Sequence, residues 1–285
     1  RVVLLSYNLP DLTAKAVRKV LEKIEARDLI LVHNGSSEKN FLKLQSLFPK
    51  IQHHRLMTNR HFSGGANSGL HFAFDQLSND PSDQLSIDPS DQSAWVLFLT
   101  NDCEILEVGE PPTTAGLYAP LIFARSENKI DSIGGGLDPQ KMVLSHFKNC
   151  EDFQKAKYKY VPGTAFWIHR DVFEKTNGFD ETYQTYWEDV DLSLRCQQLQ
   201  IPVAAAVSTR VLHQIGKTCH KDVHYTTYLF QRNRRRLARK FFSSHYANRF
   251  YLAADAIKYS YRYLRLRDWR RLKLLKQALQ DQHPS

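Results

Sequence analysis

Cysteine is scarce in this chain, and its spacing does not suit a structural metal site. Four cysteines occur among 285 residues, and no two follow the C-x-x-C pattern: Cys103, Cys150, Cys196 and Cys219. Neither a zinc site nor a disulfide framework is therefore expected. Because unpaired cysteines fit a reducing compartment, we predict a cytoplasmic location.

Long apolar runs are also missing. A helix that spans a bilayer needs roughly 20 consecutive apolar residues, whereas the densest apolar run here, residues 95–99, has the length of a strand. The chain starts with Arg1 and the strand-like segment 2–5, which lacks the pattern of a signal peptide. We therefore expect a globular protein that does not cross a membrane.

The motifs of several common enzyme classes are absent as well. No G-x-G-x-x-G follows the first apolar segment, and neither G-x-x-x-x-G-K-[ST] nor G-x-S-x-G occurs. These absences argue against a dinucleotide-binding dehydrogenase, a P-loop protein and an α/β-hydrolase. The glycine cluster at residues 64–69 precedes a helix predicted at 70–77 and remains a candidate phosphate contact.

Apolar and helical segments alternate in a way that predicts an α/β fold with a mostly parallel sheet. Residues 2–6 and 29–33 are typical of buried strands, and a helix between them is expected to end near Ile24, with Asp11 or Thr13 as its cap. Further strands are expected at 95–99, 118–123, 166–169 and 203–207, and a further helix at 190–198. In such sheets, ligands bind at the carboxyl ends of the strands.

Three other segments predict surface features. Residues 78–94 contain the unit Asp-Pro-Ser-Asp-Gln twice, starting at Asp80 and Asp88, which predicts a duplicated surface loop without a catalytic role. The three glycines at 134–136 predict a flexible turn, and residues 141–159 are expected to cross the surface.

Basic charge is concentrated at the end of the chain. The net charge is +9, but residues 217–285 carry 17 Lys and Arg against 4 Asp and Glu, so the first 216 residues have about −4. We divide the chain into a main domain, 1–216, and a basic amphipathic helical tail, 217–285, in which Asp268 is a plausible helix cap. The tail fits an anionic membrane surface, nucleic acid, or a packing appendage at a dimer contact. We predict peripheral membrane contact and no nucleic acid.

Carboxylates and one histidine are the candidates for chemistry. Asp102 follows a buried strand, where it can hold Mg²⁺ or Mn²⁺ or merely close an Asx turn. Glu188 and Asp189 lie at the start of a predicted helix. Either they cap this helix, or Asp189 acts as a general base. Asp191 is expected to pair with Arg195, four residues further along the helix. The ring of Trp187 is of a type that packs on sugars. His213 follows a short strand and can complete a metal site with Asp102.

The order of these segments resembles the inverting family 2 glycosyltransferases of the GT-A fold, particularly their bacterial rhamnosyltransferase-like branch. The match covers residues 1–216 and consists of segments 5–8, 32–36, 59–69, 98–102, 163–166 with 178–181 and 187–192, and 211–213. This resemblance implies a GT-A domain with a Rossmann-like, mostly parallel sheet flanked by helices, and a C-terminal helical extension.

The resemblance also implies a role for each matched position. Donor contacts are expected from Ser6, Tyr7, Asn8, His33, Asn34, Asn67, Asn101 and Asp102. Asp102 and His213 would hold Mn²⁺ or Mg²⁺, Asp189 would be the base, and Trp187 with Glu188 would face donor sugar and acceptor. His33 departs from the usual Asp of this family, and Thr100 replaces the first acid of the D-x-D motif.

The expected activity is transfer of a sugar from a UDP- or dTDP-sugar to a glycan or lipid-linked acceptor in bacterial surface polysaccharide synthesis. The expected location is the cytoplasm, peripheral on the inner face of the membrane, and a homodimer is an open possibility. The alternative is a nucleotide- or sugar-binding module of the same fold with weak or no turnover. The active-site hypothesis requires Asp102, Asp189 and His213 to gather around one cleft.

Overall fold

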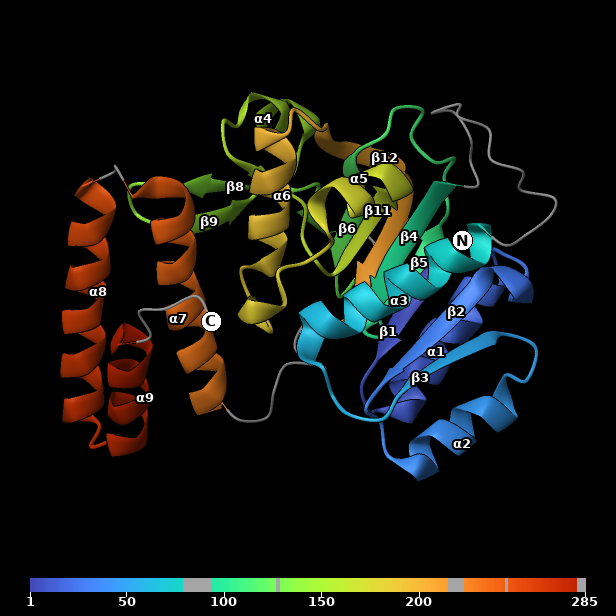
Figure 1. Cartoon of the computed structure of the whole chain (residues 1–285), viewed down its shortest axis with the longest axis horizontal. Coiled ribbons are helices and arrows are strands. Elements are labelled where there is room, and N and C mark those ends of the chain that lie inside the picture. The colour runs from blue at the N-terminus through green and yellow to red at the C-terminus, as the bar shows by residue number, and fades with distance from the viewer. Residues whose placement is uncertain (79–93, 127–128, 215–222, 244–245, 281–285) are drawn as a thin grey trace.

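Four parallel strands form one half of the central sheet (Figure 1). They are β1 (Val2–Ser6), β2 (Leu29–Asn34), β3 (Gln52–Leu56) and β4 (Trp95–Thr100), in the spatial order β3-β2-β1-β4. Because the chain proceeds outward to β3 and then returns to the other side of β1, the order reverses beside β1, where open α/β sheets bind ligands. The computed structural model describes residues 1–78, 94–126, 129–214, 223–243 and 246–280.

The other half of the sheet is mixed. β11 (Ala165–His169) runs antiparallel to β4 and to β6 (Leu117–Ala124), and β6 pairs in parallel with β12 (Val203–His213). β5 (Cys103–Glu107) closes this edge, and β7 (Ile130–Ser132) pairs with β6. The predicted strands are confirmed, but β12 continues beyond residue 207 to His213, past a register shift between Ala206 and Arg210.

Helices cover both faces of the sheet (Figure 1). α1 (Pro10–Leu21) packs in one apolar core with β1, β2 and β4, and α3 (His61–Ser78) packs in a second core on the other face. The remaining elements of this part are η1 (Ala26–Asp28), α2 (Glu38–Leu47), α5 (Arg170–Thr176), η3 (Glu181–Tyr183) and α6 (Glu188–Gln198). The expected cap of the first helix was wrong, because Leu9, in a left-handed conformation, occupies the N-cap without a side-chain hydrogen bond.

The glycine cluster lies inside α3, so a helix start at residue 70 was also wrong. A Cβ added to Gly65 would lie 2.6 Å from Asn34 Nδ2, and one added to Gly69 would lie 2.6 Å from Val32 Cγ2. These glycines therefore let α3 approach β2 closely.

A small antiparallel sheet follows the main one in sequence. It is formed by β10 (Lys159–Tyr160), β8 (Gly135–Asp138) and β9 (Val143–His146), with α4 (Cys150–Lys155) beside it. The flexible turn expected at 134–136 was wrong for Gly135 and Gly136, which pair in β8.

Three helices form the C-terminal extension: α7 (Val223–Phe242), α8 (Tyr246–Arg265) and α9 (Trp269–Gln280). The predicted cap of α9 is confirmed, because Asp268 Oδ1 accepts a hydrogen bond from Arg271 N at 3.0 Å. None of the helices within the described residues combines the length and apolarity needed to span a bilayer. The duplicated unit of segment 78–94 lies outside the described residues.

Candidate active site

The two expected metal ligands lie next to each other. Asp102 follows β4 and is 4% exposed, and its Oδ2 lies 3.5 Å from Nε2 of His213 at the end of β12. The other carboxylate oxygen accepts a hydrogen bond from the Thr100 hydroxyl at 2.6 Å. Gln214 N donates to the backbone oxygen of Asp102 at 2.9 Å and joins the ends of both strands.

This pair fits one divalent ion as a partial ligand set. Ligand bonds of about 2.1 Å place neighbouring ligands of an octahedral ion about 3 Å apart, which is close to the observed separation. Within the described part of the chain, no group of three His, Cys, Asp or Glu side chains could hold a metal. An ion here would therefore depend on substrate oxygens and water for its other ligands.

Asp189 lies in the first turn of α6 and is half-buried. Its Oδ2 accepts a hydrogen bond from Gly163 N at 3.0 Å, and its Oδ1 accepts one from Val190 N at 2.8 Å. Burial raises the pKa of Asp189 above its ordinary value, and the two backbone donors oppose that shift. A carboxylate with a raised pKa is a stronger base.

Residues 163–164 connect Asp189 to the Asp102–His213 pair. Gly163 binds Asp189, while the backbone oxygen of Thr164 accepts hydrogen bonds from Thr100 N at 3.0 Å and Thr100 Oγ1 at 3.2 Å. The same Thr100 hydroxyl donates to Asp102. These hydrogen bonds, the peptide bond between Gly163 and Thr164 and the Asp102–His213 contact thus link the three residues near the carboxyl end of β4.

The backbone before α6 is strained. Gln184, Tyr186 and Trp187 have positive φ angles of 66°, 73° and 73°, which non-glycine residues adopt at a cost of about 1–3 kcal/mol each. Asn233 of α7 holds this segment: its Nδ2 lies 2.7 Å from Tyr183 O, 2.9 Å from Thr185 O and 2.8 Å from Tyr186 O.

The two expected acceptor-facing residues are buried, and Trp187 lies beside α7. Trp187 is 2% exposed and packs on Phe230 of α7, with ring centroids 5.3 Å apart. Glu188 is 5% exposed, and burial raises its pKa well above the ordinary value, with Asp189 adding to the shift. Its Oε2 has no hydrogen-bond partner among the described residues.

Several expected donor-binding residues gather at the ends of β1 and β4. Thr13 Oγ1 lies 2.8 Å from the Ser6 hydroxyl, at hydrogen-bond distance, and accepts a hydrogen bond from Asn101 Nδ2 at 2.9 Å. Asn8 N donates to the Ser36 hydroxyl at 2.9 Å, which connects the loops after β1 and β2. Tyr7 is 44% exposed and leaves an aromatic ring open beside this cluster.

Three other expected donor contacts have internal partners. His33 is fully buried, and its Nε2 lies 2.9 Å from His53 Nδ1; burial is the main cause that lowers its pKa to about 3. Asn34 donates to His61 O at 2.7 Å and accepts from Arg60 N at 2.9 Å, which fixes the start of α3. Asn67 exchanges two hydrogen bonds with the backbone of Phe179.

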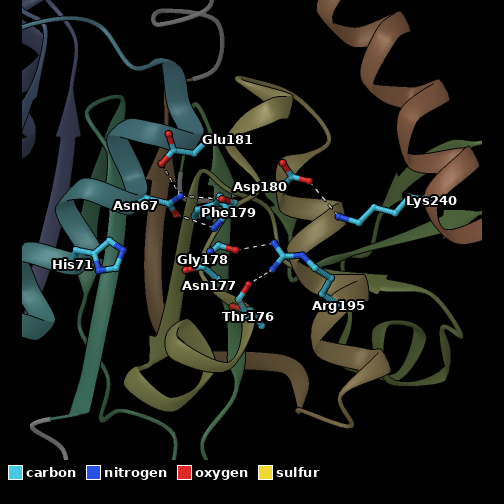
Figure 2. A pocket seen from close by; sticks show the side chains of 10 residues that line it. All are labelled: Asn67, His71, Thr176, Asn177, Gly178, Phe179, Asp180, Glu181, Arg195 and Lys240. Atoms are coloured by element: carbon cyan, nitrogen blue, oxygen red, sulfur yellow. Dashed lines mark hydrogen bonds and ion pairs between the residues drawn. The ribbon is translucent and has the colours of Figure 1, made fainter. Parts of the chain in front are cut away.

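A cavity of about 470 Å³ is lined by α3, residues 176–181, α6 and α7 (Figure 2). Arg195 in its wall bonds Asp191 at 2.7 Å and the backbone oxygens of Thr176 and Gly178, so the predicted Asp191–Arg195 pair is confirmed. Lys240 of α7 contacts Asp180 and Asp191. Because Arg195 and Lys240 are paired with acids and backbone oxygens in this wall, we assign the cavity to the packing of α6 and α7 against α3 and residues 176–181, and not to the reaction centre.

Sequence reasoning missed the residues that support the site from a distance. Asn233 acts through its side-chain amide on distant backbone oxygens, and Gly163 and Thr164 act through their own backbone groups. None of these contacts leaves a local sequence pattern, although Gly163 and Thr164 lie in a matched segment. His146 of β9 was also missed; it is near enough to lower the pKa of Asp189 electrostatically.

Comparisons with known proteins support the fold. No profile of a protein family matches the sequence, and no curated protein matches it. A structure of GalNAc-T7 with UDP, GalNAc and Mn²⁺ matches with a TM-score of 0.57 and 16% identity, over 84% of this chain and 47% of that one. The mannosyltransferase PcManGT from Pyrobaculum calidifontis, with GDP-Man and Mn²⁺, matches with a TM-score of 0.49 and 13% identity, over 98% of this chain and 73% of that one. S. aureus TarS matches with a TM-score of 0.47 and 10% identity, over 81% of this chain and 38% of that one.

The chain spans about half the length of the GalNAc-T7 structure that it matches. At this identity the likeness concerns the fold and not the activity. Together with the mixed sheet, its flanking helices and the C-terminal helical region, it confirms the predicted fold class. The chain has the GT-A fold.

Proposed function

We propose that this protein is a metal-assisted, inverting glycosyltransferase that uses a nucleoside-diphosphate sugar. The observation that carries the proposal is the connected set of Asp102, His213 and Asp189 at the carboxyl end of β4. A carboxylate–imidazole pair that can share an ion and a nearby basic carboxylate are the groups that displacement of a diphosphate by a hydroxyl requires.

Asp189 is the general base in this proposal. Its raised pKa and partial exposure suit a group that accepts a proton from an acceptor hydroxyl. The hydrogen bonds from Gly163 and Val190 fix the orientation of the carboxylate. Attack of that hydroxyl from the face opposite the leaving diphosphate inverts the configuration at the anomeric carbon.

Asp102 and His213 would hold the divalent ion, Mn²⁺ or Mg²⁺, whose chemistry is to neutralise charge on the leaving diphosphate. Tyr7, Asn8 and Asn101 lie at the adjacent strand ends, where the nucleoside of a UDP- or dTDP-sugar would bind. His33, Asn34 and Asn67 remain proposed donor contacts, but their present partners suit a supporting role better.

The acceptor is a glycan or lipid-linked sugar in bacterial surface polysaccharide synthesis, and the lineage is the rhamnosyltransferase-like branch of family 2. Both proposals extend the sequence resemblance. Trp187 and Glu188 are proposed on the acceptor side, where Phe230 of α7 covers the Trp187 ring. Contact between that ring and an acceptor therefore requires α7 to shift.

The test measures sugar transfer and hydrolysis from a panel of UDP- and dTDP-sugars with Mn²⁺, using the wild type, Asp189→Asn and Asp171→Asn. Asp171 is a matched control because its side chain is 53% exposed and belongs to α5. We expect Asp189→Asn to lower turnover by about 10²–10⁴-fold and to leave nucleotide affinity within about threefold, since the residue acts on the acceptor. The control variant, Asp171→Asn, should retain the turnover and the nucleotide affinity of the wild type.

Two outcomes would refute parts of this proposal. Undiminished turnover in Asp189→Asn would remove Asp189 from the role of base. Binding of a nucleoside diphosphate without turnover of any donor in the wild type would favour the alternative, a binding module of the same fold.

A further inference from the structure

The outer face of α8 carries an exposed apolar stripe. Phe250, Ile257, Tyr261 and Leu264 are 73%, 71%, 67% and 47% exposed. Their spacing of seven, four and three residues places them on one side of the helix. α8 lies at the end of the molecule that is farthest from the central sheet (Figure 1).

The opposite face of α8 is the one that packs. Leu252, Ala256 and Tyr263 are 9%, 9% and 4% exposed. Arg235 of α7 donates to Leu252 O at 3.2 Å, and Arg234 pairs with Asp255 at 2.5 Å. The inward face thus holds α8 on α7, and the stripe on the other side points outward.

Basic side chains flank the stripe. Residues 246–280 contain nine Lys and Arg against two Asp, a balance of +7. Lys258, Arg262 and Arg265 of α8 are all exposed, and at 100° per residue they lie on one shoulder of the stripe. The two acids are engaged, Asp255 with Arg234 and Asp268 as the cap of α9.

The apolar surface continues into the turn between α8 and α9. Leu266 in this turn and Trp269 at the start of α9 are 59% and 65% exposed, and Arg267 between them is exposed as well. Large apolar and aromatic side chains next to cations are the composition of helices that lie in a membrane interface.

The first basic cluster of the tail does not belong to this surface. Arg232, Arg234 and Arg235 of α7 are 9%, 5% and 5% exposed, and their guanidinium groups bond protein oxygens. These hydrogen bonds hold α7 against the rest of the protein. The exposed positive charge of the extension therefore belongs largely to α8 and α9.

We infer that the outer face of α8 and the α8–α9 turn dock on an anionic lipid bilayer surface. The stripe inserts at the boundary between headgroups and acyl chains, while the basic shoulder binds the phosphates of the headgroups. A second copy of the chain is a poorer occupant, because two surfaces that each expose Lys258, Arg262, Arg265 and Arg267 would repel each other. Nucleic acid would satisfy the cations but leave the apolar stripe in water. This inference rests on the extension and does not depend on the proposed transfer activity.

The test is co-sedimentation of the full chain with phosphatidylcholine vesicles, with and without phosphatidylglycerol, in the absence of nucleotide. The stripe variant is Ile257→Glu/Tyr261→Glu. Its matched control is Leu42→Glu/Leu47→Glu on α2, where the side chains are 50% and 46% exposed. Circular dichroism checks that each variant is folded, and light scattering without lipid gives the oligomeric state.

We expect the wild type to bind vesicles with phosphatidylglycerol and to bind neutral vesicles at least about tenfold more weakly. The stripe variant should lose at least about tenfold in partitioning, whereas the control should stay within about twofold of the wild type. A charge variant, Lys258→Glu/Arg262→Glu, should lose binding to anionic vesicles. The inference is overturned if the folded stripe variant binds like the wild type, if no vesicle binds, or if the stripe variant instead converts a dimeric wild type to monomers.

Discussion

Replacement of Asn233 by Ala tests how the strained segment before Asp189 is held in place. The Asn233 side chain is fully buried, and its amide nitrogen reaches the backbone oxygens of Tyr183, Thr185 and Tyr186 at 2.7–2.9 Å. Its amide oxygen accepts a hydrogen bond from Arg232 Nε at 2.9 Å. Alanine removes all of these contacts at once.

The expected loss of stability follows from the partners that remain. Tyr183 O keeps Arg232 and Thr185 N as donors, so the cost falls mainly on the other two carbonyls. Loss of a partner at a buried polar group costs about 1–3 kcal/mol. Because the Asn233 amide has only two hydrogens for these backbone oxygens, we do not count the loss of more than two full hydrogen bonds. We therefore expect the free energy of unfolding to fall by about 2–4 kcal/mol, a decrease of roughly 3–7 °C in Tm for a chain of this length.

Urea unfolding of Asn233→Ala, compared with the exposed α6 variant Gln198→Ala, measures this loss. Trp187 precedes α6, so a relaxed segment would also displace Asp189, and kcat should fall while the KM for the donor changes little. A stability loss below about 1 kcal/mol, or one equal to that of Gln198→Ala, would refute the role of Asn233 as a clamp.

Two further predictions concern pH. The pKa of His33 is lowered to about 3 because the ring is buried, so the unfolded chain gains a proton as the pH falls below about 6.5 and the folded chain does not. Between pH 7 and pH 5, urea unfolding of the wild type should lose about 2 kcal/mol that His33→Gln does not lose; parallel losses would contradict the assignment. Burial raises the pKa of Glu188, so the folded state retains a proton that the unfolded state releases above about pH 4.5, and stability declines as the pH rises. Glu188→Gln should therefore gain stability relative to the wild type between pH 5 and pH 8, and a constant difference would show that Glu188 ionises normally.

Local apolar patterns were sufficient to predict the strands that build the site. β1, β2 and β4 are fully buried or nearly so, and each is a short run of Val, Leu, Ile or Phe that ends at a polar residue. The placement of Asp102 after β4 follows directly from that pattern. The length of β12 could not be predicted in this way. The middle of this strand consists of small and polar residues and contains a register shift, so no apolar pattern indicates that the strand continues to His213.

The tail shows where charge patterns mislead. The basic tail, 217–285, was predicted to be amphipathic from its charge and apolar spacing, yet three of its arginines, Arg232, Arg234 and Arg235, are buried. Their hydrogen-bond acceptors include backbone oxygens of residues 142 and 182–183, far away in sequence. No local signal could indicate such partners, whereas the exposed stripe of α8 follows from simple helical spacing.

Binding of Mn²⁺ in the presence of a nucleoside diphosphate tests the central claim most directly. The amplitude of the electron paramagnetic resonance signal of free Mn²⁺ is followed during titration with the protein, with and without UDP or dTDP. We predict that the wild type and Asp171→Asn deplete free Mn²⁺ only when the nucleotide is present, and that His213→Ala and Asp102→Asn lose this binding by at least about tenfold. Equal depletion by the wild type and both of these variants would show that the ion, if bound, does not lie between Asp102 and His213.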